Sequence, residues 1–233
     1  MYSKDTTDNK SRMLEGRIFN IFRGERGPEE PVETQRVAFD GERYFDIRIF
    51  RKKRAEVVLK DKEDKVAVDF TKLLPPKYKL EIGKSWASDH MRNVVHIGPW
   101  SVSRDVVGLL HETGHAWNEK DQVGLFNAVY RYNASVMDYR TEDKEKADAE
   151  EGLKRAVLGN ERNAWAWGLR EARRVRRETG VDLLKDFKDV KELKEYIDYF
   201  LGGYEQAVDA VKKLEMPYAG PLTAKEIEEY TKV

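Results

Sequence analysis

The sequence predicts an α+β protein in which a small twisted sheet comes first and helices follow. Before Gly98, short runs rich in Val, Ile and aromatic residues alternate with charged turns, as strands do. After Gly98 the spacing of apolar residues lengthens towards 3.6, which is typical of helices. The chain has 233 residues and neither an internal repeat nor a low-complexity tract, so its length suits one elaborated domain.

Six strands are expected in the first part. They cover residues 17–22, 43–50, 55–60, 65–70, 79–82 and 93–97. The charged cluster from Asp61 to Asp64 separates two of these runs and predicts a hairpin connection. Pro75 and Pro76 separate the next pair of runs.

The first expected helix begins near Arg104. Ser103 is a suitable N-cap residue, and Asp105 lies in the first turn, where an acidic side chain is favourable. Further helices are expected over residues 123–139, 144–178 and 189–214, with an interruption near Gly159 left open. Pro217 and Pro221 then separate a short terminal segment over residues 224–231.

These elements predict a division of the chain into three parts. Residues 1–16 are expected to be a tail, and residues 17–216 a single domain that is strand-rich over 17–98 and helical over 99–216. Residues 217–233 form a C-terminal segment that is a candidate lid.

The composition excludes several function classes. Lys and Arg total 43 and Asp and Glu total 43, so no overall charge attracts nucleic acid or an anionic membrane. No apolar run approaches the ~20 residues of a membrane span. Cysteine is absent, which removes disulfides, thiolate nucleophiles and Cys-ligated zinc and fits a reducing compartment. We therefore expect a cytoplasmic protein with neither a nucleic-acid nor a membrane partner, in an oligomeric state that the sequence leaves open.

One motif carries chemistry. Residues 111–115 read His-Glu-Thr-Gly-His, which is HExxH, inside the first expected helix. In a chain with so few histidines the chance expectation is roughly 0.007 occurrences. Residues four apart project from one face of a helix, so His111 and His115 can reach a single zinc ion. Glu112 then lies beside the metal, where it can take a proton from zinc-bound water and later deliver it to the leaving amine.

Two histidines do not hold catalytic zinc alone, so a third ligand is required. No histidine follows His115, which leaves a carboxylate or, upstream, His90 or His96. Glu161 is the strongest candidate, because it begins an otherwise apolar helix face on which a buried charge needs compensation. Ala164 and Gly168 on that face would let this helix approach the HExxH helix closely.

HExxH on one helix and a glutamate on a following helix resemble the gluzincin zinc metallopeptidases, including the minigluzincins. The resemblance covers residues 93–177 and implies a zincin-like fold, a peptide or protein substrate, Zn²⁺ held by His111, His115 and Glu161, and Glu112 as the catalytic base. It also implies that a strand before the metal helix pairs with the substrate, and residues 93–97 stand in that place. Two features depart from the family: Glu161 lies farther along the chain than is usual, and Trp165 stands where many members carry an aspartate.

A second zincin interpretation remains open. The residues after His115 are similar to the metzincin consensus, with Asn118 at the turn and Asp121 as third ligand, and residues 135–139 resemble a Met-turn. Asn118 could serve there because Asn tolerates a positive φ. Against this interpretation, Met137 lies in a stretch with helical spacing, where core packing is the plainest role.

Two alternatives belong to other classes. The chain could be a latent or regulatory zincin-fold binding protein, or a helical interaction protein without metal. For oxyanion stabilisation His96, Tyr130, Tyr132 and Tyr139 are candidates by residue type alone.

Overall fold

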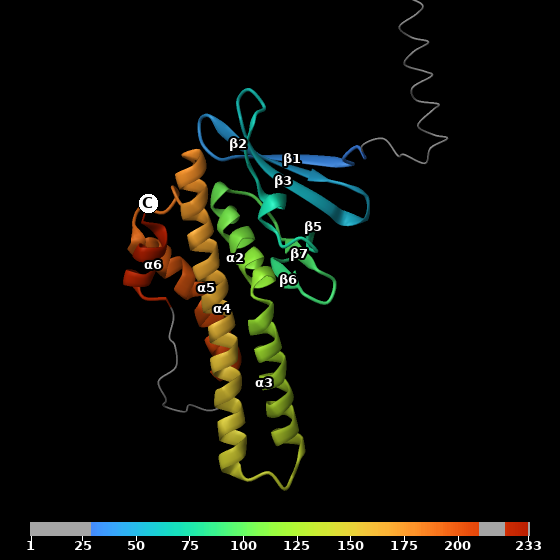
Figure 1. Cartoon of the computed structure of the whole chain (residues 1–233), viewed down its shortest axis with the longest axis vertical. Coiled ribbons are helices and arrows are strands. Elements are labelled where there is room, and N and C mark those ends of the chain that lie inside the picture. The colour runs from blue at the N-terminus through green and yellow to red at the C-terminus, as the bar shows by residue number, and fades with distance from the viewer. Residues whose placement is uncertain (1–28, 210–221, 233) are drawn as a thin grey trace, which may run out of the picture.

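The computed structural model describes residues 29–209 and 222–232. Over these residues it has a seven-stranded sheet followed by five helices, a mixed α/β structure in line with the predicted order of strands and helices (Figure 1). The expected strand over residues 17–22 and the expected tail over 1–16 lie outside the described residues. So do residues 210–221, which include the end of the fourth expected helix.

The strands are β1 (Glu33–Ala38), β2 (Arg43–Ile49), β3 (Arg54–Asp61), β4 (Val66–Asp69), β5 (Lys79–Ile82), β6 (Ala87–Asp89) and β7 (Val94–Ile97). The predictions of β2, β3, β4, β5 and β7 are confirmed to within two residues at each end. β1 and β6 were not expected. Five of the six residues of β1 are exposed, and β6 has only three residues, so neither has a readable apolar pattern.

The sheet has the order β1-β2-β3-β5-β7-β6, with β4 pairing with β3. β5 and β7 are parallel, and the other pairs are antiparallel. The expectation that residues 93–97 offer a free edge to a substrate is therefore wrong, because β7 is paired on both sides. The edge strand at this end of the sheet is β6.

The helices are α2 (Val106–Trp117), α3 (Glu119–Met137), α4 (Asp143–Thr179), α5 (Val190–Asp209) and α6 (Ala224–Thr231). The first four were expected, although α4 runs for 37 residues without an interruption at Gly159. The sequence set off the residues of α6 as a short terminal segment without predicting that they form a helix. Ser103 does not cap the first helix, since its hydroxyl donates to Asp186. Asp105 is the N-cap residue of α2 but makes no side-chain hydrogen bond to that helix; its Oδ2 instead accepts from the preceding backbone N–H groups of Ser101 and Val102 at 2.7 and 3.0 Å.

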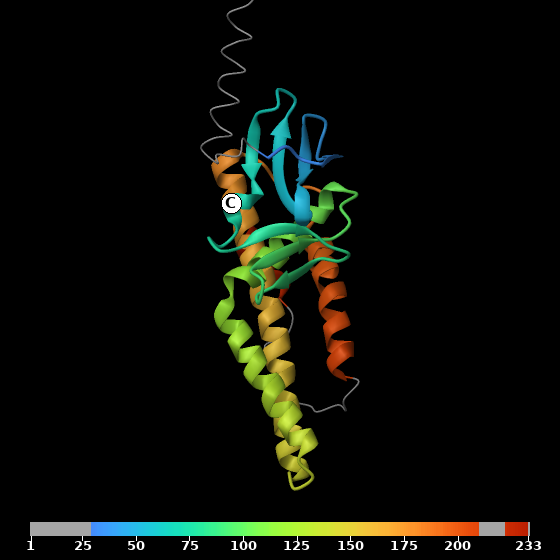
Figure 2. The ribbon, with the colours of Figure 1, turned by 90° about the vertical axis from the view of Figure 1, so that its right-hand side faces the viewer.

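α2 and α4 cross at close range beside the sheet (Figures 1 and 2). A Cβ atom added at Gly114 would lie 2.4 Å from the carbonyl oxygen of Ala164, and one at Gly168 would lie 3.3 Å from Cβ of Leu110. The predicted close approach of these helices through small residues is thus confirmed. One side of α2 buries Val106, Leu109 and Leu110 in the core that it shares with the sheet.

Below this crossing, α3 and α4 continue as an antiparallel pair that projects away from the sheet (Figure 1). α5 lies along α4 (Figures 1 and 2), and α6 packs on α4 well away from the tip of the pair (Figure 1). Within the described residues, no helix combines the length and the apolar character that a membrane crossing requires.

Candidate metal centre

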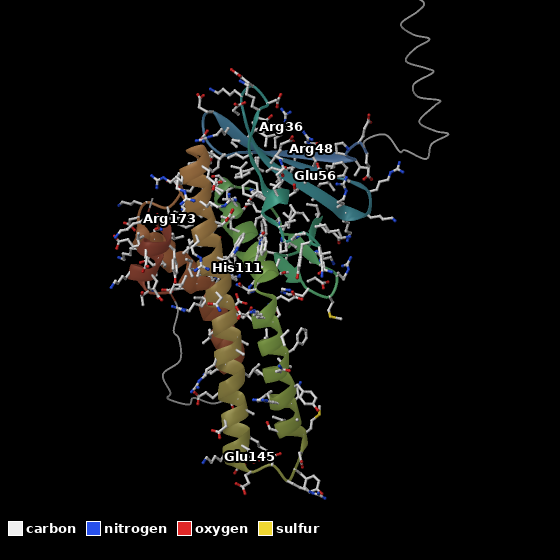
Figure 3. All side chains as sticks on the ribbon, viewed as in Figure 1. Arg36, Arg48, Glu56, His111, Glu145 and Arg173 are labelled. Atoms are coloured by element: carbon white, nitrogen blue, oxygen red, sulfur yellow. The ribbon has the colours of Figure 1, made fainter. Side chains whose placement is uncertain are left out.

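The two histidines of HExxH and Glu161 meet where α2 crosses α4. His111 and His115 are one turn apart on α2 and face Glu161 of α4, and Figure 3 shows His111 at the crossing of the two helices. The Nε2 atoms of His111 and His115 are 3.1 Å apart, and they lie 3.1 and 3.3 Å from Oε2 of Glu161. The structure therefore brings together all three residues that the sequence proposed as ligands.

These separations fit a metal ion. Ligand atoms about 2.0–2.1 Å from a tetrahedral ion lie roughly 3.3–3.4 Å from one another, close to the three observed distances. One nitrogen from each histidine and one oxygen from Glu161 converge, and among the described residues these three make up the group that can hold a metal. The group is also an ion-paired cluster in its own right.

Because the cluster is buried, an unpaired charge within it would cost free energy. His111, His115 and Glu161 are 5, 6 and 6% exposed. Burial would raise the pKa of Glu161, but the hydrogen bonds with His111 and His115 outweigh it and lower that pKa to about 2. Burial would lower the pKa of His115, but the hydrogen bond and charge of Glu161 raise it. Glu161 therefore stays negative and demands a cation, which is either a protonated imidazole or a metal ion.

Aromatic and amide side chains surround the cluster. The ring of Trp165 stacks on that of His111 with centroids 4.2 Å apart, and Trp165 also contacts Phe200 of α5. Trp165 therefore supports the histidine by packing, at the position where the gluzincin pattern has an aspartate. Asn160 is buried, helps to raise the pKa of His115, and accepts a hydrogen bond from Gln122 at 3.1 Å. Within the described part of the chain, neither Nδ1 atom of the two histidines has a hydrogen-bond partner.

Glu112 lies on α2 next to this cluster and is 8% exposed. Burial raises its pKa, and the nearby histidines oppose that shift. Its carboxylate is thus a buried group within electrostatic range of His111, His115 and Glu161 and is not a member of the converging group.

Asp121, the alternative third ligand, is not part of the group. It lies in the first turn of α3, where its Oδ2 accepts a hydrogen bond from Asn163 at 2.9 Å. Asn118 has a φ of −96°, so the positive φ expected for a metzincin-like turn is absent at this residue. Met137 is 84% exposed at the end of α3, so the expectation that it packs in the core is also wrong.

The remaining histidines have other surroundings. His90 Nδ1 is 2.7 Å from the hydroxyl of Tyr78, and His96 lies on β7. Burial and the charge of His115 lower the pKa of His90, which places the Tyr78–His90 pair within electrostatic range of the cluster. Sequence reasoning missed this pair, because its members are brought together only by the folding of two loops. Two of the tyrosines considered for oxyanion stabilisation, Tyr130 and Tyr139, are 76 and 84% exposed, unlike the buried cluster.

Comparison with known proteins gives no relative: no protein family, no curated protein and no solved structure matches this chain. From its fold and its site, the chain can be described as an α+β protein with a buried group of two histidines and one glutamate that can hold a metal ion. The functional argument therefore rests on the geometry of this group.

Proposed function

We propose that this chain is a zinc metallopeptidase of the gluzincin type, with a zincin-like fold. The observation that carries the proposal is the convergence of His111, His115 and Glu161 to within 3.1–3.3 Å of one another, with Glu112 of the same HExxH motif beside them. A structural ion pair requires no such motif, whereas two histidines and one glutamate are a known ligand set of catalytic zinc and a neighbouring glutamate can act as its general base.

The ligand set favours zinc over calcium and magnesium. Two imidazole nitrogens and one carboxylate oxygen are ligands of catalytic zinc, and three protein ligands leave a fourth position for water or substrate. Calcium and magnesium prefer oxygen ligands alone. The absence of cysteine leaves histidine and carboxylate as the zinc ligands that this chain can offer.

In the proposed reaction, His111, His115 and Glu161 hold the ion. Bound zinc supplies a Lewis acid that polarises the scissile carbonyl and makes water acidic. Glu112 accepts the proton of the attacking water and then delivers it to the leaving nitrogen. The low exposure of Glu112 keeps its carboxylate from being fully hydrated, so it stays available for this transfer.

The substrate is proposed to be an extended peptide. β6 is the edge strand, and α2, which carries the histidines, contacts both β6 and β7. A peptide added to the free edge of β6 would form main-chain hydrogen bonds that make little demand on its sequence.

Metal analysis and proteolysis test the proposal together. Wild-type protein should contain about one zinc per chain and cleave unfolded casein, while Glu112→Gln should keep zinc and lose cleavage by at least about a hundredfold. Glu161→Ala should lose both. Glu145→Gln, an exposed position near the start of the same helix, should change neither. Cleavage by Glu112→Gln at the wild-type rate would remove the assigned mechanism.

One observation favours a second function, a latent or regulatory metal-binding protein. The three ligands and Glu112 are all at most 8% exposed, so access to the cluster is narrow. Full zinc occupancy without hydrolysis of any unfolded substrate would support this alternative. The expectation that residues 217–233 form a lid stays a prediction: α6 packs on α4 through Arg162, which ion-pairs with Glu226.

A further inference from the structure

α3 presents a row of large apolar side chains to solvent. Val123, Phe126, Tyr130 and Met137 are 57, 61, 76 and 84% exposed. Steps of three, four and seven residues place them on one face of the helix, with the spacing of a coiled-coil seam. None of the residues of α3, all of which are described, is buried. This helix therefore carries a seam that no described element covers.

The positions that flank this seam are uncharged. Between Val123 and Met137 they are Asn127, Val129, Ala134 and Val136, and Gln122 lies just before them; Asn133 occupies the seam position between Tyr130 and Met137. In coiled coils, charges at flanking positions select a partner and an orientation. Because this seam has none, a like seam can approach it without charge repulsion.

The seam leads into a hollow at the end of α3 nearest the sheet. Val123 and Phe126 line this hollow of about 520 Å³ together with Trp117, Tyr78 and Pro76. At its opposite end α3 finishes with Met137, and this end of α3 is at the tip of the projecting helix pair (Figure 1). Met has a flexible apolar side chain that fills irregular hollows. The exposed face of α3 thus has a hollow at its first end and, at its last end, the Met137 side chain, which is suited to fill such a hollow.

We propose that this face binds a second copy of the chain, α3 against α3 in antiparallel orientation about a twofold axis. Met137 of each copy then enters the hollow beside Glu119 of the other, and Phe126 of each copy packs on Tyr130 of the other. Twofold symmetry makes both contacts twice, as in an isologous interface. The proposal is independent of the proposed hydrolysis.

The arrangement is sterically open. The α3–α4 pair projects from the body of the molecule, so two pairs can lie side by side with their bodies at opposite ends (Figures 1 and 2). From the exposed fractions, the seam offers on the order of 600 Å² per copy, below the ~800 Å² of a standard interface. We therefore expect a reversible dimer with a dissociation constant in the micromolar range.

Sedimentation equilibrium of the full chain tests the dimer. The wild type should shift from monomer to dimer as its concentration rises through the micromolar range, and Phe126→Glu should weaken association by at least about tenfold. Arg131→Glu is the matched control, because Arg131 is an exposed α3 residue away from the seam and its replacement should leave association unchanged. A wild type that stays monomeric at all concentrations would overturn the proposal and leave the face to another ligand.

Cross-linking tests the orientation on a background without native cysteine. The double variant Glu119→Cys with Met137→Cys should form a disulfide-linked dimer on oxidation. Each single variant should stay unlinked, because residues 137 of the two copies would be about 27 Å or more apart. Dimers cross-linked by Met137→Cys alone would indicate a parallel pair and contradict the antiparallel arrangement.

Discussion

Glu81 is a buried carboxylate whose charge is held by two cations. It lies on β5 and is 5% exposed, with Lys79 Nζ 2.7 Å from its Oε1 and Arg92 3.2 Å from its Oε2. Burial would raise its pKa, but the hydrogen bond and charge of Lys79 and the charge of Arg92 lower it below the ordinary value. The folded state therefore binds a proton at this residue less readily than the unfolded state does.

The sign of the pH effect follows from this lowered pKa. The contribution of Glu81 to stability is present above the pKa of an unfolded glutamate, ~4.3, and is lost as pH falls through the lower folded pKa. We predict that Glu81→Gln has a lower urea midpoint than wild type at pH 6, and that the difference shrinks towards pH 3. Glu195→Gln, at an exposed position on α5, should match wild type at both pH values. An equal loss for Glu81→Gln at both pH values would contradict the electrostatic explanation.

At the residue scale, the sequence was sufficient to identify the proposed ligands and the proposed base. It was not sufficient to identify side-chain contacts that form only when distant parts of the chain fold together. His111, Glu112 and His115 form a local motif, and Glu161 was found because a carboxylate heads an apolar face. The stacking of Trp165 on His111 depends on the register between α2 and α4, and the contact between Tyr78 and His90 depends on two loops. Sequence separation hides contacts of this kind.

At the element scale, apolar periodicity located α2, α3, α4 and α5, whereas α6 was set off by the prolines before it and was not predicted to be a helix. α4 continues through Gly159 because the cost of one glycine, about 1 kcal/mol, is small beside the packing of a 37-residue helix. Periodicity failed for β1 and β6, whose pairing is set by neighbouring strands. Without β6, the position of the free sheet edge beside α2 could not be predicted.

Gly114 sets the distance between α2 and α4. A Cβ there would lie 2.4 Å from the carbonyl oxygen of Ala164, so the two helices would have to separate. We predict that Gly114→Ala lowers the free energy of unfolding by about 1–3 kcal/mol, despite the better helix propensity of alanine, because overpacking at backbone cannot relax locally. Urea denaturation measures the change.

Gly159 provides the matched control on α4. It has open space where a Cβ would be placed, so Gly159→Ala should raise stability by up to about 1 kcal/mol through helix propensity alone. A stabilising effect of both substitutions would show that α2 and α4 are not held at the distance described. A loss at Gly114 alone should also weaken zinc binding, because the ligands come from both helices.

At the scale of the whole molecule, α4 is the common partner of the other helices. It contacts α2, α3, α5 and α6, and α2 in turn packs on the sheet through β6 and β7. A ligand that joins α2 to α4 therefore joins the sheet to the helical part. In the proposed holoprotein, the His111, His115 and Glu161 contacts would make metal binding a term in the stability of the entire fold.

Removing the metal should then lower the melting temperature. Free zinc at a hundred times its dissociation constant stabilises a folded protein by about 2.7 kcal/mol, or roughly 5–10 °C in a chain of this size. We expect a strong chelator to lower the melting temperature of the wild type by this amount, and zinc to restore it, in a calorimetric scan. Glu161→Ala should show no zinc-dependent shift, whereas Glu112→Gln, which keeps all three ligands, should retain it. If zinc raises the melting temperature of Glu161→Ala as much as that of the wild type, the zinc binds at another site. The proposed site requires the Glu161 carboxylate to join α4 to α2, so its stabilisation must be lost when that carboxylate is removed.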